Sequence, residues 1–395
     1  MKRQLLHTPE GVRDIYNDEC EKKMLLQDQL YHILRLHGYH PIQTPTFEFF
    51  DIFGREIGTT PSKDLYKFFD REGNTLVLRP DITPSIARCA AKYFGEEELP
   101  IRLCYMGNTF INNSSYQGRL KECTQLGAEL LGDPSVDADA EMISMVISCL
   151  KAAGLKEFQL SIGHADFFRG LMEAAGLLEE QEEELRELIS NKNFFGVEEF
   201  VETLNLEENL KNLFGMLGNL YTGSDELSAA RKCAASYPRI LKAIGDLEEL
   251  HKILEVYEVS RYVSFELGTI SNYQYYTGII FAGYTFGSGE AIVKGGRYDR
   301  LLTYFGKDSA SIGFAFVVDQ LMAALQRQKI DVPVERSVEL MVYKPAKRQT
   351  AITAAAAARA AGRCVELMLW DETKQKEDYE DYAARSRMIN VQFFA

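Results

Sequence analysis

The chain has 395 residues, a formal net charge of −14 and a pI near 5.1, and 46% of its residues are hydrophobic. This length and composition predict a globular protein of two or three domains that can bury a large core. The negative charge argues against a broad nucleic-acid or anionic-membrane surface. The first ten residues lack the apolar core of a signal peptide, and no apolar run is long enough to span a bilayer. We therefore expect a cytoplasmic protein.

The seven cysteines and six histidines show no pattern typical of a disulfide framework or a metal site. No Cys-x-x-Cys spacing occurs, and the number of cysteines is odd. Reduced, buried thiols fit these spacings best. The histidines are scattered along the chain, so we expect neither a metal ion nor another cofactor.

The first part of the chain alternates predicted helices with predicted β-hairpins. The first helix has its apolar residues on one face and ends at Gly38. The extended segment that follows is interrupted by Pro41 and Pro45, which suits an edge or interface strand. The predicted elements are helices at 19–37, 83–93 and 137–153, an extended segment at 38–54, hairpins at 65–81 and 100–129, and a strand at 158–162.

From about residue 166 to 257 the sequence is rich in Glu and Leu without a strand signal, which predicts a helical insertion. Strands are expected again afterwards, and a linker at 331–335 leads into strands that alternate with helices. The sequence thus predicts an α+β fold over 1–330, with an antiparallel sheet flanked by helices, and a short C-terminal α/β domain over 331–395. The strands expected after the insertion lie at 261–268, 278–286 and 290–299, followed by a strand that passes into a helix at 311–328.

Polar side chains gather at the ends of four predicted strands. Gln125, Gly127 and Glu129 share one face of a strand, because side chains alternate along it. That face offers an amide, a gap without a side chain and a carboxylate, yet the loop before it, 111–115, carries no charge. Taken singly, each stretch also fits ordinary packing or a turn. The other candidates are Arg79, Asp81 and Thr83, then Tyr273, Tyr275 and Tyr276 next to Gly278, and finally Arg297 and Tyr298.

Together these stretches resemble a known family. From residue 8 to about 327 the chain is similar to histidyl-tRNA synthetase, a class II aminoacyl-tRNA synthetase, whose order and spacing are followed by LRPDITP, GRLKECTQLGAE, YYTGIIF, GGRYD and SIGFAF. The stretch GYHPIQTPTFEF resembles the dimer-interface motif of that class. We therefore expect a class II synthetase-like domain that self-associates through 38–54.

The resemblance implies a pocket for L-histidine. A carboxylate and a phenol suit the imidazole ring, which both donates and accepts hydrogen bonds. Asp81 is a shorter acid than the glutamate usual in the family. The implied contacts are Asp81, Thr83 and Gln125 with the α-ammonium group, Glu129, Tyr276 and Tyr298 with the imidazole nitrogens, and Tyr275 and Arg297 beside them.

Three cations that the synthetase uses on its phosphates are absent from the matching positions. Ile111 replaces the arginine that holds the amino-acid carboxylate and the ATP α-phosphate, and Ser271 replaces the arginine that stabilises the adenylation transition state. The ATP-binding arginine of the third class motif falls at Asp319-Gln320. Removing one such contact costs on the order of 3 kcal/mol of transition-state stabilisation. The pattern predicts a pocket that binds histidine without activating it.

A synthetase-like chain of this kind resembles the regulatory subunits of ATP phosphoribosyltransferase. The segment after Asp331 is shorter and more acidic than a synthetase's anticodon-binding domain, and is ill suited to tRNA. The resemblance implies a non-catalytic subunit that is required by a short-form catalytic subunit for the first step of histidine biosynthesis, with L-histidine as the feedback effector. We expect a homodimer within a hetero-oligomer.

Two alternatives stay open at this point. One is a working histidyl-tRNA synthetase, which positions 111, 271 and 320 disfavour. The other is an ATP-dependent ligase that activates another amino acid without tRNA. Both need cations for the phosphates of ATP.

Overall fold

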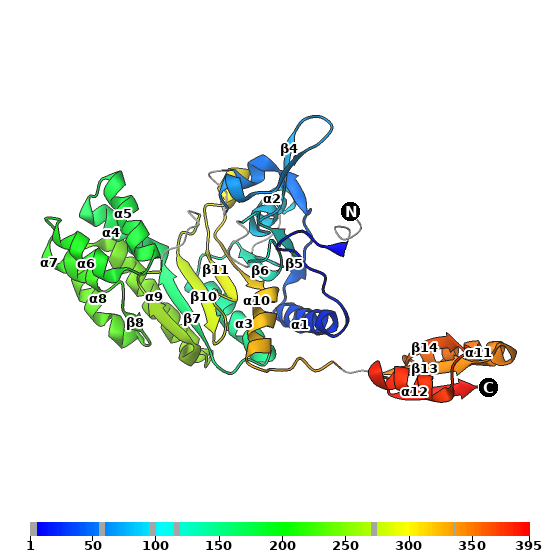
Figure 1. The fold of residues 1–395 in the computed structure, drawn as a ribbon. Helices are drawn as coiled ribbons and strands as arrows, with labels where there is room; N and C mark the ends of the chain where they lie inside the picture. The colour runs from blue at the N-terminus through cyan, green and yellow to red at the C-terminus, as the bar shows by residue number, and fades with distance from the viewer. Residues whose placement is uncertain (1–5, 55–59, 95–99, 114–118, 270–274, 335–336) are drawn as a thin grey trace. The chain divides into compact units, whose positions relative to one another are not determined.

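The computed structural model describes residues 6–54, 60–94, 100–113, 119–269, 275–334 and 337–395 (Figure 1). The chain divides into two compact units, Met1–Val332 and Pro333–Ala395. Among the described helices, none is both long and apolar enough to cross a membrane.

A nine-stranded sheet forms the centre of the first unit. Its strand order is β1-β5-β6-β12-β11-β10-β7-β9-β8. The pairs β1–β5 and β7–β9 are parallel and the others antiparallel, so the sheet is mixed where the sequence predicted an antiparallel one. The strands are β1 (His40–Pro41), β5 (Ile101–Phe110), β6 (Glu122–Leu131), β7 (Phe158–His164), β8 (Leu220–Tyr221), β9 (Val263–Glu266), β10 (Ile279–Thr285), β11 (Val293–Arg297) and β12 (Ser311–Val317).

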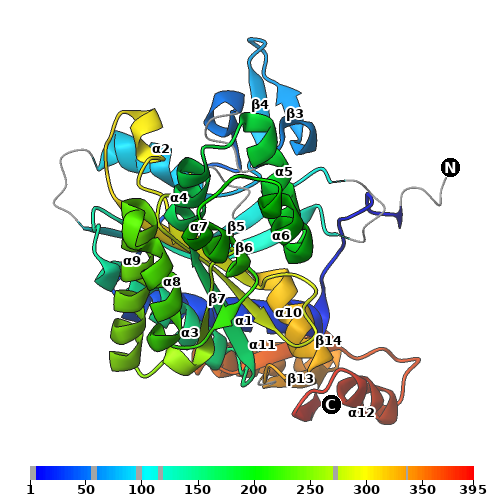
Figure 2. The ribbon, with the colours of Figure 1, turned by 90° about the vertical axis from the view of Figure 1, so that its left-hand side faces the viewer.

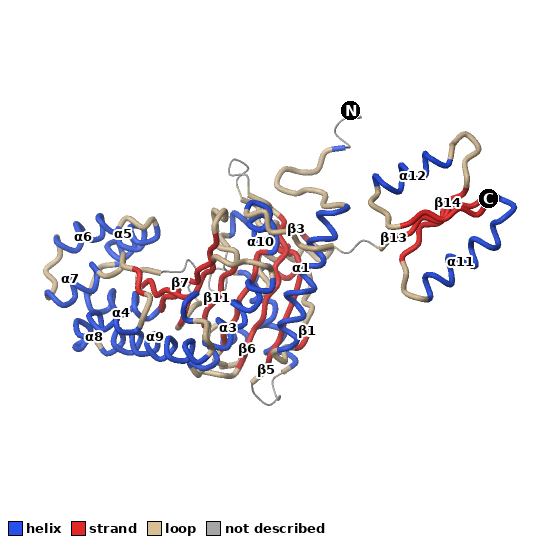
Figure 3. The backbone as a smooth tube through the Cα atoms, turned by 90° about the horizontal axis from the view of Figure 1, so that it is seen from below, coloured by secondary structure: helices blue, strands red, loops and turns tan. Residues whose placement is uncertain are grey.

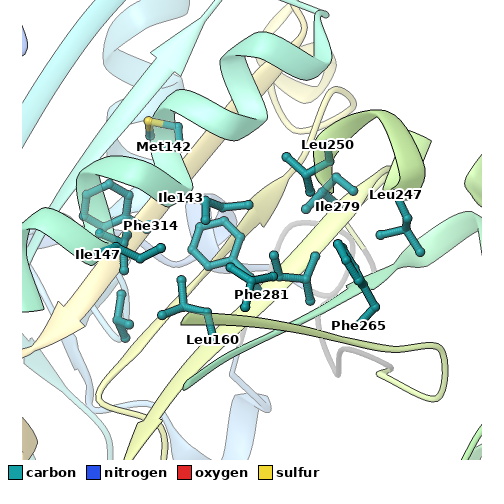
Figure 4. Close-up of a cluster of buried hydrophobic side chains, with 14 of the residues drawn as sticks. Met142, Ile143, Ile147, Leu160, Leu247, Leu250, Phe265, Ile279, Phe281 and Phe314 are labelled. Atoms are coloured by element: carbon teal, nitrogen blue, oxygen red, sulfur yellow. The ribbon is translucent and has the colours of Figure 1, made fainter. Parts of the chain in front are cut away.

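The largest hydrophobic core fills one face of this sheet. On β6, Leu126, Ala128 and Leu130 are all 0% exposed and belong to this core, as the alternation of side chains requires. Side chains of α3, α9 and four strands meet in its centre (Figure 4). Each fully buried Leu, Ile or Phe stabilises the fold by about 1.5–3 kcal/mol. The helices that contribute to this core include α1 (Asn17–Leu36), α3 (Val136–Ala152), α9 (Pro238–Val256) and α10 (Val318–Arg327).

The opposite face of the sheet packs against α2 (Thr83–Tyr93), which begins and ends where the sequence predicted. The segment 38–54 is not one continuous strand: β1 joins the large sheet, whereas β2 (Phe47–Phe49) belongs to a separate three-stranded sheet of order β2-β4-β3. The predicted hairpin at 65–81 supplies β3 (Lys67–Phe69) and β4 (Thr75–Leu78).

The predicted helical insertion lies between β7 and β9 along the chain. Its helices face the viewer in Figure 2. The prediction that it contains no strand is wrong at β8, because Leu220 and Tyr221 pair with Glu266 and Phe265 of β9. This pairing attaches the insertion to one edge of the large sheet. Its helices are α4 (Ala165–Ala175), α5 (Glu179–Ser190), α6 (Phe194–Glu202), α7 (Glu208–Gly215), α8 (Ser228–Cys233) and α9.

The second unit is a small α/β structure. Its three parallel strands have the order β14-β13-β15, and α11 and α12 lie on opposite faces of them (Figure 3). Met341 packs with α11, whereas Leu340 and Val342 pack with α12. The elements are β13 (Val338–Tyr343), α11 (Arg348–Ala360), β14 (Cys364–Leu369), α12 (Lys376–Arg385) and β15 (Asn390–Phe394).

Candidate functional site

A buried carboxylate lies at the centre of the predicted site. Glu129 on β6 is 1% exposed, and its two oxygens accept hydrogen bonds from different hydroxyl groups. The Thr83 hydroxyl donates to Oε1 at 2.8 Å, and the Tyr298 hydroxyl donates to Oε2 at 2.5 Å. These residues come from β6, the start of α2 and the residue after β11. The structure therefore brings together three side chains that the sequence placed in one site.

Burial raises the pKa of Glu129 from 4.5 to about 8, although the two hydroxyl donors act in the opposite direction. A charged carboxylate loses its water here, and two neutral donors do not replace that water fully. The charge of Asp81 raises the pKa further. Glu129 is therefore poised to gain a hydrogen-bond donor or a cation as an additional partner.

We expect Glu129 to make folding pH-dependent. Between pH 4.5 and about 8 the native state keeps a proton that the unfolded state has lost, so stability falls as the pH rises through this window. One proton corresponds to about 1.4 kcal/mol per pH unit. Urea unfolding at pH 6, 7, 8 and 9 should show that Glu129→Gln gains stability relative to the unmodified chain up to about pH 8. Parallel stability curves for the two proteins would contradict this prediction.

Four tyrosine rings belong to the same buried cluster as the start of α2. The ring centroid of Tyr275 lies 4.8 Å from that of Tyr276 and 5.9 Å from that of Tyr298. Burial, with the charge of Glu129 adding to it, raises the pKa of Tyr105 and of Tyr298 well above the ordinary value, so both keep their protons. The structure thus places Tyr275 and Tyr276 in one cluster with Tyr298, which donates to the carboxylate.

Tyr105 is a site residue that the sequence analysis missed. It lies on β5 directly opposite Gly127 of β6. A Cβ atom at Gly127 would lie 2.7 Å from the Tyr105 hydroxyl, so the gap seen in the sequence is occupied by this ring. A Cβ atom at Gly313 would likewise lie 1.5 Å from Oε2 of Glu129. Only glycine at these two positions leaves room for the side chains of Tyr105 and Glu129.

Gln125 and Asp81 provide two more acceptors. Gln125 lies on the same face of β6 as Glu129. Its Oε1 atom is buried and has no hydrogen-bond partner among the described residues. A buried amide oxygen without a partner is unfavourable, and is typical of a site that awaits a donor. The carboxylate of Asp81 accepts a hydrogen bond from the backbone N–H of Ile82 at 2.7 Å, and burial raises the pKa of Asp81.

Two arginines of the candidate stretches serve the fold instead. Arg297 is bonded to Asp139, with Nε–Oδ1 at 2.9 Å, and also donates to the carbonyl oxygens of Asp133 and Ser135. Arg79 donates to the carbonyl oxygens of Thr44, Pro45 and Asn108. These guanidinium groups are buried and engaged with the protein, so we expect Arg297 not to contact histidine. The residues involved are Arg79, Arg297 and their acceptors at 44, 45, 108, 133, 135 and 139.

The positions that match the synthetase's cations carry no positive charge where the structure describes them. The backbone N–H of Ile111 donates to the carbonyl oxygen of Lys121 at 2.9 Å. Asp319 forms an ion pair with Lys23. Ser271 and the candidate Tyr273 lie outside the described residues. Within the described ranges, no group of three or more His, Cys, Asp or Glu residues is arranged to hold a metal ion.

Comparison with known proteins identifies the family. A model of the histidyl-tRNA synthetase family matches residues 11–321. A relative from Acetivibrio thermocellus is 41% identical over 365 residues, which cover 92% of this chain and 86% of that protein. A relative from Ruminiclostridium cellulolyticum is 38% identical over 391 residues, or 99% and 93% of the two chains. Both relatives are named ATP phosphoribosyltransferase regulatory subunit. The chain belongs to this regulatory subunit family.

Solved structures agree with membership in the regulatory subunit family. A protein from Bacillus halodurans described as an ATP phosphoribosyltransferase regulatory subunit/histidyl-tRNA synthetase has a TM-score of 0.87 and 32% identity, covering 99% of this chain and 98% of that one. The histidyl-tRNA synthetase of Nostoc sp. PCC 7120 has a TM-score of 0.80 at 18% identity, covering 97% and 90%, which shows a shared fold alone. The predicted family and fold class are therefore confirmed.

Proposed function

We propose that this chain is the non-catalytic regulatory subunit of ATP phosphoribosyltransferase and that it binds L-histidine in the Glu129 pocket. One combination of observations carries the proposal. The site keeps buried acceptors, Glu129 and the Gln125 oxygen that has no hydrogen-bond partner among the described residues, whereas Asp319-Gln320 stand at the position of a phosphate-binding cation. Such a site favours a ligand with several N–H donors over one with phosphates.

Histidine matches the donors and acceptors of the pocket. Its imidazole ring would donate one N–H to Glu129 and meet the hydroxyl groups of Tyr276 and Tyr298. Its ammonium group would donate to Gln125 and Asp81. The hydroxyl hydrogen of Thr83 already serves Glu129, so the Thr83 oxygen is left as an acceptor. The proposed contacts thus come from six of the eight residues predicted from sequence. Tyr275 packs beside Tyr276 and Tyr298, and Arg297 is left out.

The family name supports the proposed partner, a catalytic subunit of ATP phosphoribosyltransferase. We propose that this partner is a short-form enzyme without a regulatory domain of its own, which joins ATP to phosphoribosyl pyrophosphate in the cytoplasm. This chain would be required for that activity and would transmit feedback inhibition by histidine. It would use no cofactor and bind no tRNA.

Self-association is proposed through 38–54. Phe47 and Phe49 on β2 are 52% and 55% exposed, whereas Glu48 between them is 8% exposed and bonded to Arg88. The two rings therefore lie on the same outward face of the strand. An exposed apolar face of this kind is typical of an interface.

We expect light scattering at micromolar concentration to give about twice the chain mass of 44.8 kDa. Charges placed on the outward face of β2 should separate the dimer, because a carboxylate resists burial without a partner. Phe47→Asp combined with Phe49→Asp should therefore yield a monomer. Phe195→Asp is a matched control, since Phe195 is 70% exposed on α6, away from this strand. A monomeric unmodified chain would argue against the proposed interface.

The proposed function is tested with the purified chain and a separately purified short catalytic subunit. Calorimetry should detect histidine binding to this chain alone. Product formation from ATP and phosphoribosyl pyrophosphate should require both proteins and should fall when histidine is added. A chain that neither binds histidine nor activates the catalytic subunit would contradict the proposal.

A further inference from the structure

One buried carboxylate connects three elements next to the proposed histidine pocket. Asp319 lies in the first turn of α10, and its side chain is 6% exposed. Its Oδ1 accepts a hydrogen bond from Nζ of Lys23 on α1 at 2.6 Å, and its Oδ2 accepts one from the backbone N–H of Thr124 on β6 at 2.7 Å. The elements α1, β6 and α10 lie side by side (Figure 1).

The bond to Thr124 continues the sheet beyond the end of β12. Pairing between β6 and β12 ends at Gln125 and Val317, after which the chain turns into α10. Asp319 then supplies the acceptor that a further strand residue would have supplied. On the β5 side, the Thr124 hydroxyl donates to Oδ1 of Asn108 at 3.0 Å. The residue that precedes Gln125 is thus held from both neighbouring elements.

Lys23 keeps this arrangement favourable. A carboxylate buried to this extent loses most of its water, and a positive charge at hydrogen-bond distance compensates for that loss. The Lys23 side chain is itself only 15% exposed, so the pair is little screened by solvent. Without Lys23, the buried carboxylate of Asp319 would have no cation beside it. Among the described residues, the Thr124 N–H would remain as its hydrogen-bond donor.

We propose that Asp319, held by Lys23, is a positioning residue for histidine binding. It fixes β6 at Thr124, and thereby the amide oxygen of the adjacent Gln125 that receives the ligand's ammonium group. This inference rests on the proposed function of the Glu129 pocket. It assigns a role to a side chain that itself contacts no part of the ligand.

A second ion pair provides a matched control. Lys22, the neighbour of Lys23 on α1, is paired with Asp331. Its side chains are more exposed, at 35% and 74%, and neither of them is bonded to β6. Removing this pair should perturb α1 without changing β6 at Thr124.

The test compares two ligands by competition calorimetry on the full chain. Histidine carries the ammonium group, and imidazolepropionate lacks it but keeps the ring and the carboxylate. Asp319→Ala should weaken histidine binding about tenfold and imidazolepropionate binding less than about twofold. Asp331→Ala should change neither affinity by more than about twofold.

A conservative variant separates positioning from charge. Lys23→Met alone should weaken histidine binding, because it leaves the acid unpaired. Lys23→Met combined with Asp319→Asn keeps an acceptor for the Thr124 N–H without a buried charge, and should bind histidine within about threefold of the unmodified chain. If Asp319→Ala does not fold, the affinities of Lys23→Met and of the Lys23→Met, Asp319→Asn double variant for the two ligands test the same inference.

Equal weakening of both ligands would show that Asp319 supports the pocket as a whole, and would overturn the inference. Histidine binding that is insensitive to Asp319→Ala and to Lys23→Met would overturn this inference alone. Absence of histidine binding by the unmodified chain would overturn the proposed function and the inference with it.

Discussion

No exchange of pyrophosphate into ATP is expected with histidine or with any other amino acid. Adenylation needs cations on the developing phosphate charge, and the matching positions hold Ile111, Ser271 and Asp319-Gln320. If each missing cation costs on the order of 3 kcal/mol, the loss of three lowers the rate by about six orders of magnitude. The rate would then fall below the background of the assay.

The measurement is histidine-dependent exchange of labelled pyrophosphate, with a working histidyl-tRNA synthetase assayed in parallel. Ile111→Arg alone should not restore exchange, because Asp319 remains in place with its own partner, Lys23. Exchange above the level seen without amino acid would contradict the prediction. Such exchange would show that the chain activates an amino acid, as a synthetase or an ATP-dependent ligase does.

Histidine binding should depend strongly on Glu129. The imidazole N–H favours the ionised form of Glu129 in the complex, and Glu129→Gln keeps the size of the side chain but cannot supply that charge. A charge-assisted hydrogen bond contributes about 1.5–3 kcal/mol, so the affinity should fall roughly 10- to 150-fold. Calorimetry on the purified chain measures this loss directly.

A matched control lies on the same strand. Glu122 is bonded to the side chain of Asn108 and lies outside the tyrosine cluster. Glu122→Gln should therefore leave the histidine affinity unchanged, while circular dichroism shows that both variants are folded. Equal affinities of Glu129→Gln and the unmodified chain would place the histidine site elsewhere.

The parts of the site that depend on local periodicity were predictable from the sequence. Gln125 and Glu129 lie on the same face of β6 because side chains alternate along any strand. Leu126 lies on the opposite face and packs into the large core. The helix that positions Thr83 was also predictable, since its apolar spacing and Pro84 at the helix start are local signals.

The parts that depend on pairing between distant segments were not predictable. Tyr105 enters the site through its register with Gly127, which no local pattern of either strand specifies. The ion pair of Lys23 with Asp319 joins residues 296 positions apart. The motif around Arg297 does not tell whether its guanidinium group meets a ligand or, as here, Asp139. The strand β8 has only two residues, too few to show a periodicity.

Feedback inhibition measured with a variant regulatory chain shows whether this chain is the histidine sensor. The catalytic subunit is kept unchanged and is combined either with the unmodified chain or with Glu129→Gln, and histidine inhibition is measured for both assemblies. A ligand shifts an equilibrium only by its differential affinity for the two states. If this chain is the histidine sensor, the half-inhibiting histidine concentration should rise by about the factor by which Glu129→Gln weakens binding. Unchanged inhibition, with binding to this chain weakened, would place the regulatory site on the catalytic subunit and would contradict a sensor role for this chain.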